Sequence, residues 1–579
     1  MNDESQKLLQ LRKLKKYFSV GKHKELKAVQ DVSFVINQGE KFGVVGESGC
    51  GKSTLGRTIL QLYPQTSGSC VYYGKTISDI QPQYLHKEIS KLPDYQKAAA
   101  EYYQKSLQLD KKIEEINSKL AQLEADSSKK DKKEVEKLRA DAEKLKLESK
   151  ECRKNASRQL REGSRTVGSL ILCKDIDKVQ ELFFKSEDEM KISHHAYLEY
   201  WKLHDQYVSN IVTIDQMDHC SEQIAELQKK ESLSEIETYR LADLIHTQKK
   251  IKNADRASLE AQNAELSKKI DEQKEIERIH QEKDKAFRLQ AFDLYHGKDI
   301  LPITERTQDP KYQAKLDRNY ETGINLNKLT KKELREIRPD LQMVFQDPSA
   351  SLDPRETIGK AIEEVFQINT KMPENLRHEK TLELLQQVDL KPEHYYSYPN
   401  SLSGGMKQRA GIARAIALNP KFVILDEAVS ALDVSVQAQI LLLLNKLQEQ
   451  KHLTYMFITH DLGVVKHFCD RVLVMYLGNV CELATSEELF HKPLHPYTQS
   501  LLAAVPRLTL QKDRKDEEIL QGEVPSPIDP PHGCPFHTRC PKCMKICSVE
   551  KPEYIEYSPG HFIACHLYRQ NSKNDEEEA

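Results

Sequence analysis

The feature that most constrains the fold is an early glycine-rich run, Gly46-Glu47-Ser48-Gly49-Cys50-Gly51-Lys52-Ser53-Thr54. Its spacing is G-x-x-x-x-G-K-S, in which glycines let backbone N–H groups point at phosphate oxygens. The apolar run 41–45 before it predicts a buried strand, and residues 55–62 after it predict a helix, whose N-terminus attracts anions. Because this context argues against a chance glycine-rich turn, we expect Lys52 to reach the β- and γ-phosphates and Ser53 to ligate Mg²⁺.

Composition limits the classes of protein that fit the chain. At 579 residues it is long enough for three or four domains. A net charge of −2 offers no basic field to nucleic acid, and no apolar run reaches the ~18 residues of a membrane span. Because the N-terminus has no basic and apolar leader, we expect a cytosolic chain that meets a membrane only from inside.

The first 45 residues predict an antiparallel pair of strands, because two alternating runs, 9–14 and 32–36, flank turn residues. Tyr17 ends the first run, and its π-face suits stacking on an adenine. A half-buried strand tyrosine is the plainer interpretation, and Phe18 is the competing aromatic residue. Turn signals also bound a short strand at 69–73.

Between about residues 82 and 325, glycine almost disappears and Lys, Glu and Gln dominate. Apolar residues recur there at heptad spacing in two stretches, which predicts two helices packed along a seam. A turn at 127–133 would make them an antiparallel hairpin. A functionally silent spacer is the alternative. The seam consists of Leu109, Ile113, Ile116, Leu120 and Leu123, then Val135, Leu138, Ala142 and Leu145.

The rest of this helical segment is less regular. A second helical region is expected at 222–282, interrupted at 253–255. Between the two helical regions, aromatic side chains are numerous enough for a small core: Phe183, Phe184, Tyr197, Tyr200 and Trp201.

Polar side chains follow three predicted strands in the last third of the chain. Gln346 follows 341–345, Asp426 and Glu427 end 422–427, and His460 ends 455–460. Asp426 suits the Mg²⁺ side of a phosphate-loop ATPase, and Glu427 is placed to polarise water as a general base. Two adjacent acids after an apolar run rarely serve packing, because unpaired buried charge is costly. Gln346 can contact Mg²⁺ and the attacking water, and His460 can contact the γ-phosphate. Taken alone, either residue is as readily explained by a structural role.

A second anion site is predicted at Leu402-Ser403-Gly404-Gly405-Met406. A Ser-Gly-Gly at the start of a helix exposes backbone N–H groups. As a bare motif it is only a helix N-cap, and it gains meaning from the acidic strand that follows.

Six elements occur in the order in which an ABC-type ATPase domain has them, so the chain resembles such a domain. These elements are Gly46–Thr54, Gln346, Leu402–Met406, Phe422–Glu427, Ser430–Asp433 and His460. Over roughly 1–80 and 326–570 it is similar to the ATP-binding subunits of oligopeptide and dipeptide importers, particularly the OppF type. This closer similarity is carried by the runs 345–355 and 426–439 and by His495-Pro496-Tyr497-Thr498.

The resemblance implies an α/β fold, an ABC-type P-loop ATPase domain with a RecA-like core, an antiparallel β-subdomain and a helical subdomain. We expect its two parts at 1–80 and 326–490. A helical, coiled-coil insertion at 81–325 interrupts it, and a small Cys-rich extension at 491–579 follows it.

The resemblance also implies the function and the partners. The chain would bind and hydrolyse ATP to power oligopeptide import, as a peripheral subunit on the cytoplasmic side of the cell membrane. It would form a head-to-tail heterodimer with an OppD-like ATPase subunit, which ATP closes and hydrolysis reopens. Two transmembrane permease subunits and, indirectly, a peptide-binding lipoprotein would be its other partners, with no nucleic acid.

The same resemblance assigns the site residues. Tyr17 would stack on adenine, and the loop residues Gly46, Glu47, Ser48, Gly49, Cys50, Gly51, Lys52, Ser53 and Thr54 would hold the phosphates. Mg²⁺ would be held by Ser53, Gln346 and Asp426, and catalysis carried by Glu427, His460, Gln346 and Lys52. The partner's nucleotide would meet Ser403, Gly404, Gly405 and Asp433 in trans.

Near the end of the chain, cysteines recur with the spacing C-x5-C-x6-C-x17-C, at Cys534, Cys540, Cys547 and Cys565. The spacing resembles the C-terminal extension of these importers' ATPases, where some members hold a [4Fe–4S] cluster. Four thiolates also suit structural zinc, and reduced, packed cysteines are the third interpretation. Cys543 is an additional thiol.

Two other classes remain as alternatives. Chromosome-maintenance or DNA-repair ATPases also carry a coiled coil inside an ABC domain. In that class the glutamine loop precedes far longer arms, whereas here Gln346 follows the insertion. Soluble translation-associated ABC proteins carry two ATPase domains per chain, and this chain has the motifs of one.

Overall fold

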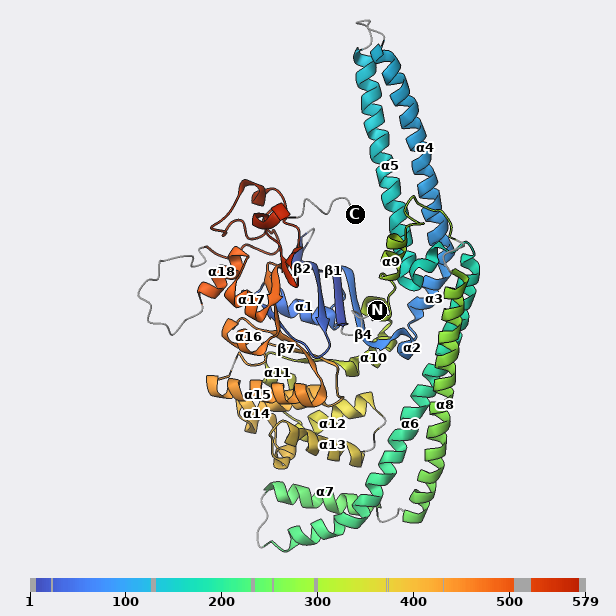
Figure 1. The fold of residues 1–579 in the computed structure, drawn as a ribbon. Coiled ribbons are helices and arrows are strands. Elements are labelled where there is room, and N and C mark those ends of the chain that lie inside the picture. Colours follow the sequence, from blue (N-terminus) through green and yellow to red (C-terminus); the bar gives the residue numbers. More distant parts are fainter. Residues whose placement is uncertain are drawn as a thin grey trace. The chain divides into compact units, whose positions relative to one another are not determined.

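A computed structural model describes residues 7–21, 24–125, 132–230, 235–251, 255–295, 300–370, 372, 374–430, 432–504 and 522–571. The chain divides into two compact units. Figure 1 shows its helices and strands, coloured along the sequence. Unit 1 contains 1–74, 202–267 and 325–579, and unit 2 contains 75–201 and 268–324. Two long helices belong in part to each unit, α6 (Ile176–Gln228) and α8 (Arg256–Tyr295).

Unit 1 is built on an eight-stranded sheet in the order β11-β12-β10-β9-β3-β8-β7-β6. Strands β9, β3, β8, β7 and β6 run parallel, and β10, β12 and β11 continue the sheet antiparallel. The apolar strands β7 and β8 are buried along their whole length, as expected for a sheet covered on both faces. The bounds are β3 (Lys41–Val45), β6 (Leu341–Val344), β7 (Phe422–Asp426), β8 (Thr454–Ile458), β9 (Arg471–Tyr476), β10 (Asn479–Thr485), β11 (Ile555–Ser558) and β12 (His561–Ile563).

A second sheet has the order β2-β1-β4-β5, with β1 antiparallel to both β2 and β4. The predicted pair of N-terminal strands and the strand at 69–73 are therefore confirmed. The strands are longer than the alternating runs suggested, because β-bulges carry the pairing past their irregular positions. The bounds are β1 (Lys7–Ser19), β2 (Glu25–Asn37), β4 (Ser67–Thr76) and β5 (Gly323–Asn325).

The helix after the phosphate loop, α1 (Lys52–Ile59), begins three residues earlier than predicted. Gly51 precedes it with a φ of 102°, so the backbone turns directly from a left-handed residue into the helix. The other helices that lie wholly in unit 1 are α7 (Glu235–Ile251), α10 (Lys331–Ile337), α11 (Pro348–Ser351), α12 (Ile358–Asn369), α13 (Glu374–Gln387), α14 (Gly404–Ile416), α15 (Val434–Lys451), α16 (Leu462–Phe468), α17 (Ser486–His491) and α18 (Pro496–Ala503).

Unit 2 is helical, and its longest elements, α4 and α5, pack against each other as antiparallel neighbours (Figure 1). Every predicted seam position is at least half-buried, while the residues between are mostly exposed. Of the expected turn at 127–133, residues 127–131 lie outside the described residues, and 132–133 already belong to α5. The bounds are α2 (Ile77–Ile80), α3 (Gln83–Ser90), α4 (Leu92–Ala125), α5 (Lys132–Val167) and α9 (Pro310–Asp317).

The core of unit 2 is more aliphatic than the sequence suggested. Phe183 is buried, but Trp201 is 44% exposed. The centre is supplied by the short three-ten helix η1 (Gly168–Leu172), whose residues are all buried. The expected aromatic core was therefore wrong in part. Aromatic content alone does not show which face of a long helix packs against a core.

In the described part of 222–282 the chain is helical in the end of α6, in α7 and in α8, but α6 ends at Gln228, a break that the sequence did not predict. The expected interruption at 253–255 falls largely on 252–254, which lie outside the described residues. Within unit 1, α7 packs against the three-ten helix η4 (Pro392–Tyr396). In the described part of the chain, none of the helices has both the length and the hydropathy that crossing a membrane requires.

Candidate nucleotide site

The predicted catalytic residues meet at one edge of the eight-stranded sheet. Gln346 follows β6, Glu427 follows β7 and His460 follows β8, and these three strands are parallel neighbours. The carboxyl ends of parallel strands lie at one edge, where open α/β sheets bind ligands. The phosphate loop leaves β3 at the same edge, because β3 pairs in parallel with β8.

Two glycines of the loop are required by close backbone packing. Gly46 and Gly51 have φ values of 153° and 102°. A Cβ on Gly46 would lie 2.2 Å from the carbonyl oxygen of Met475, and one on Gly51 would lie 2.1 Å from that of Ala28. Any side chain at either position would therefore displace the loop.

Lys52 holds its charge inside the loop. Its Nζ donates hydrogen bonds to the carbonyl oxygens of Gly46 at 2.8 Å and Glu47 at 3.1 Å. The side chain is buried, so little water competes for the ammonium group. A positive charge enclosed by a glycine-rich loop and the start of α1 suits a polyphosphate.

A hydroxyl and a carboxylate meet between the loop and β7. Ser53 Oγ donates a hydrogen bond of 2.7 Å to Oδ1 of Asp426, which is fully buried. Burial raises the pKa of Asp426, and the bond from Ser53 opposes that rise. Among the described residues, Oδ2 of Asp426 has no hydrogen-bond partner, and Nη2 of Arg57 lies 4.0 Å from it. A buried, unbonded carboxylate oxygen beside a hydroxyl fits the hard oxygen ligands of Mg²⁺.

Glu427 contacts the other two catalytic candidates at this edge, Gln346 and His460. Its Oε2 accepts a hydrogen bond of 2.7 Å from Nε2 of Gln346, and its Oε1 lies 3.5 Å from Nδ1 of His460. Its φ is 47°, and its N–H donates to the carbonyl oxygen of Ile458 on β8 at 2.9 Å. This hydrogen bond holds the left-handed residue against β8, and backbone of this kind is often found at functional sites. The arrangement presents an oriented carboxylate that can accept a proton from water.

The second glycine motif forms a helix N-terminus. Ser403 Oγ accepts a hydrogen bond of 3.3 Å from the N–H of Met406 at the start of α14. Asp433 likewise caps α15, accepting from the N–H of Val436 at 3.2 Å, and this region packs closely on Gly405. The plainer interpretation of the Ser-Gly-Gly motif as an N-cap is thus confirmed. A role of Ser403 and Asp433 towards a second nucleotide stays a prediction.

The two aromatic candidates for adenine differ in their surroundings. Phe18 packs edge-on against Tyr63 and lies under Nζ of Lys16, which is 4.5 Å from its ring centre. Tyr17 is half-buried, and this burial raises its pKa. Because the ring of Phe18 is engaged within the protein, Tyr17 remains the better candidate for stacking.

Sequence reasoning placed Glu47 among the phosphate-loop residues but missed its partners from the C-terminal region. Nη1 and Nη2 of Arg539 donate to the two carboxylate oxygens of Glu47, at 2.8 and 3.1 Å. The N–H of Glu47 donates to Oη of Tyr497 at 3.0 Å. The signal that could have raised the question was an acidic residue in a loop that binds anions, which needs a compensating cation.

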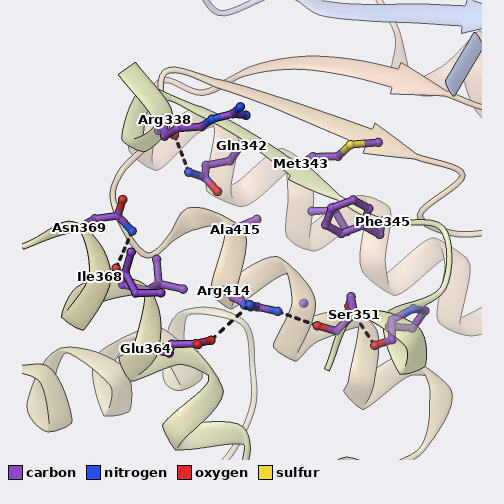
Figure 2. A pocket seen from close by; sticks show the side chains of 14 residues that line it. Arg338, Gln342, Met343, Phe345, Ser351, Glu364, Ile368, Asn369, Arg414 and Ala415 are labelled. Atoms are coloured by element: carbon purple, nitrogen blue, oxygen red, sulfur yellow. Dashed lines mark hydrogen bonds and ion pairs between the residues drawn. The ribbon is translucent and has the colours of Figure 1, made fainter. Parts of the chain in front are cut away.

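A pocket of 340 Å³ lies beside β6 and the residues that follow it (Figure 2). Its lining combines exposed apolar groups, among them Phe345 and Ile368, with charged side chains. Arg414 crosses the pocket, donating to the carbonyl oxygen of Ser351 at 2.6 Å and lying 3.5 Å from Glu364. Phe345, which lines the pocket, directly precedes Gln346 in the sequence.

The four predicted cluster cysteines lie in unit 1. Cys534 and Cys547 are buried, and Cys540 and Cys565 are half-buried. Burial, reinforced by neighbouring thiols, raises the pKa of Cys534 to about 12 and that of Cys565 to about 11. Within the described ranges, no three or more His, Cys, Asp or Glu side chains are arranged to hold a metal ion. The iron–sulfur prediction thus gains no support from this arrangement.

Two sequence families match the chain. The family described as "ABC transporter" matches residues 29–174 and 311–430. The family described as "Oligopeptide/dipeptide transporter, C-terminal region" matches residues 481–547. The second match includes the segment that carries Tyr497 and Arg539.

Individual relatives point the same way. The chain is 52% identical over 248 residues to the oligopeptide transport ATP-binding protein AppF of Bacillus subtilis, covering 42% of this chain and 75% of that protein. It is 48% identical over 251 residues to the putative oligopeptide transport ATP-binding protein YkfD of the same organism, covering 43% and 76%. It is 49% identical over 245 residues to the probable peptide ABC transporter ATP-binding protein y4tS of Sinorhizobium fredii, covering 42% and 69%.

Proposed function

The chain belongs to the ATP-binding subunits of oligopeptide/dipeptide ABC transporters, and we propose that it powers peptide import from the site at the ends of β3, β6, β7 and β8. Its reaction is ATP hydrolysis coupled to transport, with ATP and Mg²⁺ as cofactors. The observation that carries the proposal is the contact of Glu427 with Gln346 and His460. The chromosome-maintenance alternative is not carried further, because the relatives described above are peptide-transport ATP-binding proteins.

In this proposal the loop Gly46–Thr54 encloses the phosphates, with Lys52 at the β- and γ-phosphates. Tyr17 stacks on the adenine. Ser53, Asp426 and Gln346 hold Mg²⁺, which when bound neutralises charge on the phosphates. The buried, unbonded oxygen of Asp426 supports this ligand set.

Catalysis then depends on how the chain holds one carboxylate. Glu427 takes a proton from the attacking water. Gln346 fixes one of its oxygens by the bond of 2.7 Å, while His460, on the other side, contacts the γ-phosphate. A base held from both sides keeps its orientation without solvent reorganisation.

The full transporter needs a second ATPase subunit, and we propose an OppD-like partner in a head-to-tail heterodimer. The starts of α14 and α15, with Ser403, Gly404, Gly405 and Asp433, would face the partner's nucleotide. Exposed N–H groups at a helix start, with the hydroxyl of Ser403 already oriented, suit a γ-phosphate. ATP would close this interface and hydrolysis would reopen it.

The pocket beside β6 is proposed as the contact with a permease. Its exposed Phe345 and Ile368, and the bridging Arg414, offer apolar surface and charge to a short cytoplasmic helix. Because Gln346 follows Phe345 directly, movement at the catalytic site would reach that helix. Two transmembrane permease subunits would be bound in this way, and a peptide-binding lipoprotein indirectly, which places the chain on the cytoplasmic face of the membrane.

We also propose the domain division that the resemblance implies, with ATPase parts at 1–80 and 326–490. Residues 81–325 would be an insertion and 491–579 an extension. The helices α3 to α9 support the insertion, although 202–267 group with unit 1. For the extension, a [4Fe–4S] cluster on Cys534, Cys540, Cys547 and Cys565 is proposed on the spacing of these cysteines alone.

The test is purification of the tagged chain from its native membranes in mild detergent, with the bound proteins identified. We expect two permease subunits and a second ATPase. Ile368→Glu, at a side chain 71% exposed in the pocket, should lose the permeases and keep nucleotide binding. Leu442→Glu, at a 70% exposed position on α15, is the matched control and should keep both. An ATPase that is stimulated by DNA and brings down no membrane protein would refute the proposal.

A further inference from the structure

We infer that the C-terminal extension completes the phosphate loop, with Arg539 acting as a positioning residue that, together with Tyr497, holds Glu47 in the conformation that binds phosphate. The inference rests on the nucleotide site proposed above. It assigns to the extension a part in ATP binding, separate from any metal that the extension holds.

Glu47 is held through three different groups. Its carboxylate receives two parallel hydrogen bonds from Arg539, at 2.8 and 3.1 Å. Its N–H donates to Oη of Tyr497 at 3.0 Å, and its carbonyl oxygen accepts from Nζ of Lys52 at 3.1 Å. Side chain, N–H and carbonyl are thus all engaged, so this residue has little freedom to rotate.

The loop needs such an external constraint. Gly46 before Glu47 and Gly49 two residues after it have φ values of 153° and 77°. Glycine reaches many conformations at similar free energy, so a loop that contains three glycines is not held by its own backbone preferences. Ordering it in advance lowers the conformational entropy lost when a nucleotide binds.

Arg539 is itself rigidly placed. Its side chain is 5% exposed, and its guanidinium lies 5.8 Å from the ring centre of Tyr476. The rings of Tyr476, Tyr497 and Phe536 pack together with centres 4.8 to 5.3 Å apart. A planar guanidinium held on a buried aromatic cluster gives a fixed fork for a carboxylate, which a lysine cannot reproduce.

The segment that carries Arg539 is tied together by turns. The N–H of Arg539 donates to the carbonyl oxygen of Phe536 at 3.0 Å, and the N–H of Cys534 to that of Cys547 at 2.7 Å. The bidentate fork therefore depends on the local fold of the Cys-rich segment. Disturbing that fold should weaken ATP binding even where no catalytic residue changes.

The experiment compares Arg539→Met, Arg539→Lys, Glu47→Gln and the double variant Arg539→Met/Glu47→Gln in the full chain. Binding of MgATP and the KM and kcat for ATP are measured. We expect Arg539→Met to raise the KM and the dissociation constant about tenfold, with kcat within about twofold, because hydrogen bonds to charged groups are worth that much. Arg539→Lys should recover part of the loss. The double variant should resemble the worse single variant, since both remove one interaction.

Two controls make the outcome decisive. Arg471→Met removes another ion pair of unit 1, that of Arg471 Nη1 with Glu40 Oε1 at 3.1 Å, and should leave the KM for ATP unchanged. Lys52→Ala must weaken binding, or the nucleotide site itself is wrongly assigned.

If Arg539→Met does not fold, Tyr497→Phe removes only the hydroxyl that accepts from Glu47, and it should raise the KM about threefold. The inference is wrong if Lys52→Ala loses binding while the folded Arg539 and Tyr497 variants keep a KM within twofold of the parent. It is also wrong if the effects of Arg539→Met and Glu47→Gln simply add.

Discussion

Glu427→Gln should separate ATP binding from ATP hydrolysis. In the structure Oε2 of Glu427 accepts from Nε2 of Gln346 at 2.7 Å. The amide oxygen of the introduced glutamine accepts the same bond, and the side chain has the same volume. The fold and the shape of the site should therefore persist. What is lost is the negative carboxylate, which lies 3.5 Å from His460 and alone can take a proton from water.

The size of the effect follows from that loss. General-base catalysis contributes typically ~10²–10⁴ in rate, which corresponds to about 3–5 kcal/mol in the activation barrier. Lys52 and Ser53 are untouched, so the dissociation constant for MgATP should stay within about threefold. Bound ATP should consequently persist and hold the proposed heterodimer closed.

The assay is single-turnover hydrolysis of labelled ATP by the purified transporter, together with equilibrium nucleotide binding and size-exclusion chromatography. Lys52→Ala is the matched control, because it removes the loop cation and should weaken binding itself. Near-normal turnover by Glu427→Gln would show that another group is the base, and the assignment of the three contacting residues would fail.

Three further predictions concern other parts of the chain. Anaerobically purified protein should be brown and contain iron and acid-labile sulfide, and Cys543→Ser should not change that; colourless protein with zinc would favour zinc, and no metal would favour packed thiols. Burial lowers the pKa of His495 to about 4. Because the unfolded chain binds a proton at His495 below about pH 6.5 and the folded chain does not, the free energy of unfolding should fall by at most about 3 kcal/mol between pH 6.5 and pH 4. His495→Asn should remove this slope in denaturant unfolding measured against pH. Replacing residues 86–320 with a short Gly/Ser linker should leave ATP binding intact, since long loops cost little closure entropy; a folded product that cannot bind ATP would place the insertion in the site.

The strands that build the site could be predicted from the sequence because buried parallel strands are short, continuous apolar runs. The predicted strand at 422–427 is β7 (Phe422–Asp426), and the one at 455–460 is β8 (Thr454–Ile458). Glu427 and His460, expected at the sheet edge, lie just beyond these strands. The contact of Ser53 with Asp426, 373 residues apart, was expected only because the motifs around both residues indicate the same Mg²⁺ ion. Residue spacing by itself carries no information on contacts at that separation.

The helical segment shows the other limit. Heptad spacing predicted the seam of α4 and α5, because neighbouring turns of a helix share a face. It did not predict that 202–267 group with unit 1, or that α7 packs on η4. Those contacts depend on which face of a long helix packs against another element. The sequence of α6 has no face that is clearly more apolar than the others, so the packed face could not be predicted.

The pairing of strands explains how a C-terminal residue reaches an N-terminal loop. Strands β11 and β12 extend the sheet beyond β10, and only β9 separates β10 from β3, which leads into the phosphate loop. Glu482 on β10 is fully buried, and it accepts hydrogen bonds from the N–H groups of Leu494 and His495 while bonding to Nε2 of His561 at 2.8 Å. A buried carboxylate with all its partners present rigidly joins β10, β12 and the start of α18. The extension is thus attached to β10, which lies two strands from β3 and the phosphate loop. This brings Arg539 close enough to hold Glu47, although 492 residues separate them in the sequence.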